Sequence, residues 1–416
     1  MNSHSRRAFL SGSAAVAAGV AGAAAASQAE ATGAVPLGEL PPDLQPAVQR
    51  LEPYFTPQDK FQDVSRGRPV PHSLSADQLH AAGLTRETWQ LEILADPESP
   101  AKLGRQFRRE DQTAINFQTL LQLAARNTVQ FAKVMTCLNI GCPLGMGLWQ
   151  GLPLRDLLWM TQPTADFRRV FYYGFHNNDP QQLFRSSLPA GRVLEDYDGL
   201  PPVLVCWKLN GHWLSPQRGG PVRIVVPEHY GFKSVKWLTT ILLSNGASAN
   251  DTYINGNNDV DSPLKTFAAM LELPAKVQAN TAIPVTGYAQ AGISGLAKVQ
   301  VWVSPAEISW PSEDPWFQTA LWQDAVILPP PAEWGGDFAA DCSLNGTFGF
   351  TADGRPQHWP MRLAKVHWAA LLPPLSPGRY NLRCRTIDAQ GAAQPLPRPF
   401  RKSGRCDIEE REFVVE

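Results

Sequence analysis

Cys137 is the residue of this chain best suited to act as a single thiolate ligand. It follows the apolar segment Val129–Thr136 and precedes a stretch rich in glycine. A thiolate is a soft, electron-rich ligand for transition metals, and metal binding stabilises its deprotonated form. The six cysteines show neither the paired C-x-x-C spacing of zinc sites nor the C-x-x-C-H pattern that attaches haem. The spacing therefore excludes a zinc or haem framework.

A disulfide is the alternative role for this cysteine. Cys142 follows five residues later, and an oxidising compartment would permit the two thiols to pair. The three late cysteines, Cys342, Cys384 and Cys406, could pair as well. The sequence does not assign these pairs.

The elements around Cys137 are predicted to place it at the end of a strand. Apolar residues recur at helical spacing within residues 112–127, and Val129–Thr136 alternates like a strand. The glycines and proline of residues 141–151 predict an irregular loop, in which the backbone can approach a bulky ligand without Cβ clashes. Cys137 thus stands where a cofactor would fit.

Further strands are predicted on both sides of a surface connection. Residues 203–205 and 222–226 are apolar strand candidates with an Asn210–Gly211 turn between them. Residues 245–261, rich in Asn, Gly and Asp, predict a surface connection near a domain boundary. Beyond Ile283, short alternating strands separated by Gly/Pro turns favour an immunoglobulin-like sandwich, a pattern that other β folds share.

The amino terminus has the features of an export signal. Ser5-Arg6-Arg7-Ala8-Phe9-Leu10 precedes an uncharged run of Ala, Gly and Ser, and Ala29-Glu30-Ala31 offers a cleavage point. This pattern predicts a twin-arginine signal peptide and a periplasmic protein, exported already folded and often with a cofactor in place. A membrane anchor is the alternative, but alanine and glycine contribute little insertion energy, so no stable span is expected after signal removal.

Composition indicates a globular protein of two domains that acts on small molecules. The 416 residues are 44% hydrophobic and 18% charged, with 37 prolines, 32 glycines and 13 tryptophans. A net charge of -1 without dense basic runs argues against nucleic acid or acidic lipid as a partner. We predict a signal peptide at 1–31, a linker at 32–50 and two domains, at 51–260 and 261–416.

Several ordered blocks of the chain resemble the sulfite-oxidase family of molybdopterin-dependent oxidoreductases. In the first domain the blocks are residues 135–139 (MTCLN), 148–156 (LWQGLPLRD), 208–211 (KLNG), 220–227 (GPVRIVVP) and 230–238 (YGFKSVKWL). In the second domain they are residues 287–289 (GYA), 292–295 (GISG) and 385–388 (RTID). The resemblance covers nearly all of the chain beyond the signal.

The resemblance implies a fold, a cofactor and a reaction class. The fold would be an α+β molybdopterin domain followed by an all-β immunoglobulin-like domain that forms a homodimer. The cofactor would be molybdenum-molybdopterin, with Cys137 as the protein's sulfur ligand to the metal and no haem in this chain. The reaction would be a two-electron oxygen-atom transfer with a small-molecule oxygen-atom donor or acceptor. Electrons would pass to or from a separate partner such as a cytochrome.

The same resemblance assigns positively charged and polar residues to the site. Arg223, Ser234 and Lys236 match positions that contact the cofactor, whose anionic phosphate suits charge-assisted hydrogen bonds. Arg218 stands where the family has a histidine. Arg66, in residues 64–69 (VSRGRP), resembles an arginine near the substrate and is assigned a catalytic role with Cys137. Each of these basic residues could instead be a solvated charge or an ion-pair partner.

The chain departs from sulfite oxidases at positions associated with the substrate. Trp207 stands where we expect a tyrosine, and Leu296 stands where these enzymes place a substrate arginine. No arginine follows Cys137 within residues 138–143. Sulfite is therefore one possible substrate among others. A protein that keeps the scaffold to bind cofactor or a partner, without turnover, is the alternative function.

Overall fold

The computed structural model describes residues 40–65, 69–164, 166–176, 179, 181, 183–254, 258–261, 263–395, 404 and 406–416. Residues 1–31, predicted to be a signal peptide, and Arg66 lie outside this set. Within the described residues, no helix combines the length and apolar character needed to cross a membrane.

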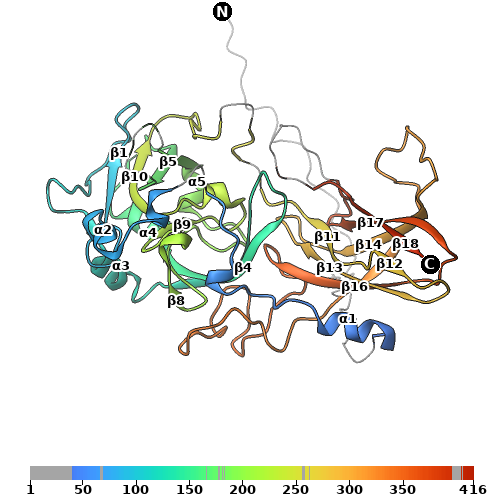
Figure 1. Cartoon of the computed structure of the whole chain (residues 1–416). Helices are drawn as coiled ribbons and strands as arrows, with labels where there is room; N and C mark the ends of the chain where they lie inside the picture. The colour runs from blue at the N-terminus through green and yellow to red at the C-terminus, as the bar shows by residue number, and fades with distance from the viewer. Residues whose placement is uncertain are drawn as a thin grey trace, which may run out of the picture. The chain divides into compact units, whose positions relative to one another are not determined.

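Residues 90–244 form two five-stranded sheets (Figure 1). One sheet is mixed, because β1 and β10 pair in parallel while its other neighbours are antiparallel. Its strand order is β2 (Ile115–Asn116), β1 (Gln90–Ala95), β10 (Leu238–Ser244), β5 (Arg169–Gly174) and β6 (Arg185–Pro189). The antiparallel sheet has the order β3 (Val129–Thr136), β4 (Pro143–Pro153), β7 (Leu204–Leu209) and β8 (His212–Trp213), with β9 (Arg223–Val225) paired to β7.

Short helices connect the strands, so this part of the chain is α+β. The α-helices are α1 (Gln45–Gln49), α2 (Ala76–Ala81), α3 (Phe117–Ala124), α4 (Leu154–Trp159) and α5 (Ala190–Leu194). The 3₁₀ turns are η2 (Pro42–Leu44), η3 (Gln58–Lys60), η4 (Val70–His72), η5 (Pro216–Arg218) and η6 (Gly231–Lys233). Asn116 caps α3 by accepting a hydrogen bond from the Thr119 amide at 2.8 Å, which satisfies an otherwise unpaired donor.

The remaining strands form an all-β region. Their order is β11 (Phe267–Glu272), β13 (Ile283–Gln290), β16 (Lys365–Leu372), β15 (Gln323–Ile327), β14 (Lys298–Pro305), β17 (Gly378–Ile387), β18 (Glu409–Val415) and β12 (Lys276–Val277). Residues 323–325 of β15 pair with β14 and residues 326–327 pair with β16, so β15 joins the two halves of this strand order. Strand β11 also contacts β17. The all-β prediction is confirmed. The immunoglobulin-like assignment stays a prediction, as does the boundary at 260/261, which falls between β10 and β11.

The prediction of an irregular loop at residues 141–151 is wrong, because residues 143–153 form the long strand β4. Three of its glycines face closely packed neighbours. A Cβ at Gly145 would meet the Phe61 ring, one at Gly147 would meet Leu209, and one at Gly151 would meet the backbone of β7. Glycine here removes side-chain volume inside a sheet.

Two other predictions from composition need correction. Residues 40–50, within the expected linker, form η2 and α1, and Leu40 and Leu44 pack with Leu328 and Ala369. Asn210 and Gly211 do form a turn, with φ of 53° and 83°, but the turn joins β7 to β8 instead of leading into β9. The turn was therefore predicted correctly from the sequence, whereas the short strand β8 that follows it was not predicted.

Gly287 gives a test of packing in the all-β region. A Cβ there would overlap the fully buried Trp368 ring and the Ala269 carbonyl oxygen. Because overpacking costs about 1–3 kcal/mol or more, we expect Gly287→Ala to lower the free energy of unfolding by at least about 2 kcal/mol. Gly191→Ala is the control, since nothing lies within 4 Å of a Cβ there and alanine favours helix. Equal effects of the two changes in urea unfolding curves would contradict this packing.

Candidate functional site

A pocket of about 430 Å³ is built from segments far apart in the sequence. Its lining comes from the Phe61–Ser65 segment, the end of β3 with the residues after it, β4, the 174–184 region, η5 with β9, η6 with residues 234–237, and residues 252–258. Cys137, Arg218, Arg223, Ser234 and Lys236 all line this pocket. The side chains that the sequence singled out and that the structure describes are thus brought together.

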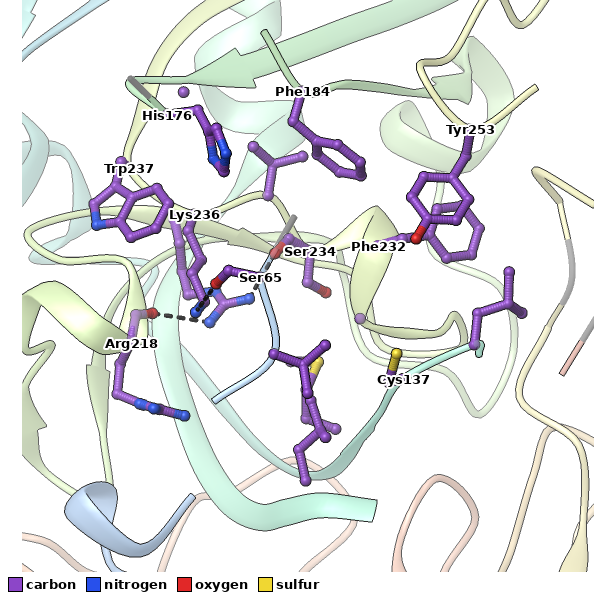
Figure 2. A pocket seen from close by; sticks show the side chains of 18 of the residues that line it. Ser65, Cys137, His176, Phe184, Arg218, Phe232, Ser234, Lys236, Trp237 and Tyr253 are labelled. Carbon is purple, nitrogen blue, oxygen red and sulfur yellow. Dashed lines mark hydrogen bonds between the residues drawn. The ribbon is translucent and has the colours of Figure 1, made fainter. Parts of the chain in front are cut away.

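Cys137 is half-buried directly after β3 and faces the pocket (Figure 2). Strand β3 is buried from Phe131 onward, so the point where the chain leaves the sheet is fixed. The Gly141 amide donates to the Cys137 carbonyl oxygen at 3.3 Å and turns the chain back toward β4. Among the six cysteines, all described, the structure contains no disulfide. The thiol of Cys137 therefore remains available to a ligand.

Arg223 is buried at the start of β9 and held by backbone oxygens. Its Nη1 donates to the Arg218 carbonyl at 2.8 Å and its Nη2 to the Ser234 carbonyl at 2.5 Å. Burial lowers the pKa of Arg223 to about 10, so the guanidinium is charged at neutral pH. The Ser234 hydroxyl accepts the Val226 amide at 3.1 Å, which leaves its proton for donation into the pocket.

Asp63 is the carboxylate that joins the cations of this site. Lys236 Nζ lies 2.8 Å from Asp63 Oδ1 and 3.0 Å from the Ser65 hydroxyl (Figure 2), and Arg218 Nη2 lies 3.7 Å from the same Oδ1. Burial lowers the pKa of Lys236 to about 8, with Arg223 adding repulsion and Asp63 opposing. Burial also acts against ionisation of Asp63, but its hydrogen bond and charge pairing with Lys236 hold the pKa of that carboxyl below its usual range.

Two histidines adjoin this cluster. His72 Nδ1 lies 3.2 Å from Asp63 Oδ2, and burial, opposed by Asp63, lowers the pKa of His72. His176 is buried, lines the pocket and lies 6.1 Å from Trp237 between ring centroids. Neither histidine was assigned to the site from sequence.

Comparison with known proteins identifies the family. Residues 79–252 match the model of the oxidoreductase molybdopterin binding domain. An NADPH nitrate reductase from Fusarium oxysporum is 29% identical over 174 residues, which are 41% of this chain and 19% of that protein. One from Beauveria bassiana is 34% identical over 126 residues, 30% of this chain and 14% of that protein. The chain thus matches less than a fifth of these relatives' length.

A solved structure agrees in fold. The sulfane dehydrogenase SoxCD from Paracoccus pantotrophus matches with a TM-score of 0.58 and 15% identity, covering 89% of this chain and 85% of that chain. Residues 79–252 thus form a molybdopterin-binding oxidoreductase domain, and the three comparisons together indicate the sulfite-oxidase family of molybdopterin oxidoreductases. The matched domain includes Cys137, Arg218, Arg223, Ser234 and Lys236, whereas Asp63, Ser65 and His72 precede it. A molybdopterin-binding domain indicates a molybdenum-molybdopterin cofactor.

The pocket fits the anionic part of a molybdopterin. Arg218, Arg223 and Lys236 supply three cations, and Asp63 supplies a carboxylate. Arg218 is 7% exposed, and its Nε is a buried donor without a hydrogen-bond partner among the described residues. A buried unpaired donor costs about 1–3 kcal/mol, which a phosphate oxygen would offset. The surplus of donors and positive charge therefore matches a phosphate group.

Trp207 and Leu296, the two substitutions that cast doubt on sulfite as the substrate, lie outside this pocket. Trp207 is 3% exposed and packs in a core with Leu152 and Val222, and Leu296 is 6% exposed in a second core. Neither is among the residues that line the pocket. The inference that these two residues alter the substrate site is not supported by their positions.

Sequence analysis did not predict many of the residues that line the pocket. It also missed Asp63, an exposed aspartate beside the pocket, because no motif marks its contacts with Lys236 and Arg218. Tyr253 and Thr252 line the pocket from the segment expected to be a surface connection, and Asp251 there is 2% exposed. A run of Asn, Gly and Asp is usually solvated, but here the Lys233 ammonium group pairs with the Asp251 carboxylate.

The lowered pKa of Lys236 predicts how anion binding depends on pH. In cofactor-free protein Lys236 should lose its proton as pH rises through about 8, so the affinity for sulfate should fall by about tenfold between about pH 7 and pH 9. Sulfate keeps its charge over this range. Lys236→Arg, which stays charged, should show a flat profile in calorimetric titrations. A matching fall in this variant would exclude Lys236 as the titrating group.

Proposed function

We propose that this chain is an exported molybdopterin oxidoreductase in which Cys137 ligates molybdenum and a small molecule exchanges an oxygen atom. The observation that carries the proposal is the convergence of a half-buried thiol and three cations on one pocket. Thiolates suit this metal class, and arginine and lysine suit the anionic pterin phosphate. When bound, the cofactor supplies two-electron oxygen-atom transfer.

Several side chains of this protein would share in binding the phosphate of the cofactor. Arg218, Arg223 and Lys236 would hold the phosphate, with the Ser234 hydroxyl as a further donor. Arg223 is already oriented by two backbone carbonyls, so little side-chain entropy would be lost on binding. Asp63 keeps Lys236 and Arg218 from repelling each other, which preserves the cluster before the cofactor enters.

Metal and pterin content test the function. Full-length protein from a molybdenum-replete host that makes the cofactor should contain both in equal amounts. Cys137→Ser should change the visible spectrum and lower turnover by at least about 100-fold, because even outer partners of metal ligands contribute about 10–100-fold. Cys342→Ser, at a half-buried cysteine outside the pocket, is the matched control. Persistent absence of molybdenum and pterin would overturn the proposal.

Oxygen-atom transfer would be measured in both directions, with sulfite, sulfoxides, N-oxides and nitrate. The relatives' names motivate nitrate as well as sulfur compounds. Electrons would travel to or from a separate protein such as a cytochrome, and we propose a homodimer through the all-β region. Light scattering of the purified protein measures the dimer directly.

Export is proposed from the Arg6-Arg7 pair and the weakly hydrophobic run behind it. Replacing both arginines by lysine should leave the protein in the cytoplasm with its leader attached, because twin-arginine recognition needs the guanidinium pair. Fractionation of cells with immunodetection measures the distribution. Unchanged periplasmic delivery would reject this route while leaving the enzyme assignment standing.

A further inference from the structure

The pocket has a second, chemically different side beside Cys137. Phe184, Phe232 and Tyr253, which we call the aromatic wall, line it together with Cys137 and Ser234 (Figure 2). Figure 2 shows Phe232 and Tyr253 on the side of Ser234 away from Arg218 and Lys236, with Phe184 above Ser234. The two sides would therefore meet different parts of the bound molecules.

The aromatic wall is connected directly to the loop that carries Cys137. Asn139, two residues after the cysteine, donates its amide to the Tyr253 hydroxyl at 3.0 Å. Phe232 follows Gly231, and a Cβ on Gly231 would lie 3.4 Å from the Met135 sulfur and the Thr136 carbonyl oxygen. The segments that carry Phe232 and Tyr253 thus both approach the chain near Cys137.

The three rings form a compact unit with partly exposed faces. Phe232 and Tyr253 stack with centroids 5.6 Å apart, and Phe184 meets Tyr253 edge-on at 5.7 Å. All three side chains are half-buried. The remaining surface is apolar and lines the pocket, so it would gain by contact with another apolar or aromatic group.

A buried ion pair holds the wall in place. Lys233 and Asp251 are fully buried and 2.9 Å apart, and Lys233 also donates to the Ser187 carbonyl at 2.7 Å. They adjoin Phe232 and the Thr252–Tyr253 segment, respectively. Since burying two charges is costly unless their geometry is fixed, this pair restricts how the wall can move.

The aromatics on the basic side are already engaged by cations. Arg218 lies over Phe61 at 5.8 Å, Arg223 over Trp149 at 5.2 Å and Lys236 over Trp237 at 5.4 Å from the ring centroids. On the wall, Lys233 lies 5.5 Å from the Phe232 ring, but its charge is paired with Asp251. The wall is thus the less charged side of the pocket among the described residues.

We propose that the aromatic wall is the substrate contact and that it selects oxygen-atom donors or acceptors bearing a planar aromatic group. This inference rests on the proposed function. The phosphate would occupy the basic side, so an aryl group would fit against Phe184 and Tyr253. The Tyr253 hydroxyl accepts from Asn139 and retains a proton to donate to the substrate oxygen. Small inorganic anions would gain little from the wall.

For an aryl sulfoxide the balanced reaction is reduction to the sulfide. The S–O bond breaks, the sulfur is reduced by two electrons, and the oxygen leaves as water with two protons. Two equivalents of a reduced viologen dye would supply the electrons in the assay. The aryl ring itself takes no part in the bond changes and contributes binding only.

Equilibrium binding of sulfones, chemically resistant analogues of the sulfoxides, provides a readout apart from turnover. In calorimetry on full-length holoprotein with measured molybdenum and pterin, methyl phenyl sulfone should bind about tenfold more tightly than dimethyl sulfone, because an aromatic pair contributes binding beyond the apolar area that it buries. Tyr253→Leu and Phe184→Leu should reduce the preference to about threefold or less. Methyl phenyl sulfoxide should show the same preference in KM over dimethyl sulfoxide.

Matched variants keep the test specific. Tyr253→Phe preserves the ring and should keep the phenyl preference, even though it removes the partner of Asn139. Trp316→Ala, at a 52% exposed tryptophan outside the pocket, should change neither ligand's affinity. Circular dichroism would confirm that each variant is folded.

The outcomes separate this inference from the proposed function. Equal affinity for the two sulfones in molybdenum-loaded protein, or a phenyl preference unchanged in both leucine variants, would overturn the aromatic-wall assignment and leave the oxidoreductase standing. Protein that never contains molybdenum and pterin would overturn both.

Discussion

The gathering of positive charge around Asp63 is the constraint on which the site depends. Arg218, Arg223 and Lys236 are drawn out of water into one pocket, where their mutual repulsion and lost hydration both act against the charged forms. Backbone carbonyls and one carboxylate offset only part of that cost. A multiply charged anion in the pocket would offset the rest of that cost.

The sheets make this arrangement possible by fixing where each segment ends. Strand β3 ends at Thr136 and releases Cys137, while β9 begins with Arg223 and pairs with β7. The glycines of β4 let that strand pack closely against Phe61, Leu209 and β7. Close packing at these points limits how far the thiol and the guanidinium can move relative to each other. Chemistry at the pocket thus relies on a rigid antiparallel sheet beneath it.

The positions of Trp207 and Leu296, and that of the aromatic wall, say more about where a substrate would bind than the family assignment does. Trp207 and Leu296 lie in hydrophobic cores, so their identity bears on packing. The aromatic wall lies at the cysteine, and its residues come from segments that the Lys233–Asp251 pair fastens together. Under the proposals made above, the rings of the aromatic wall determine substrate choice, and the cations on the basic side bind the phosphate.

Local patterns in the sequence determined the strand before Cys137 and the all-β character of the carboxyl-terminal region. Val129–Thr136 was predicted as a strand with its observed bounds, although the strand is buried from Phe131 onward and its burial does not alternate. The resemblance supplied Cys137, Arg218, Arg223, Ser234 and Lys236, which the fold brings to one pocket. Tertiary structure alone decided that the glycine-rich stretch is a strand, that Asp63 joins the cations and that Asp251 is buried. Each of these depends on a neighbour distant in sequence, whose volume or charge no local pattern contains.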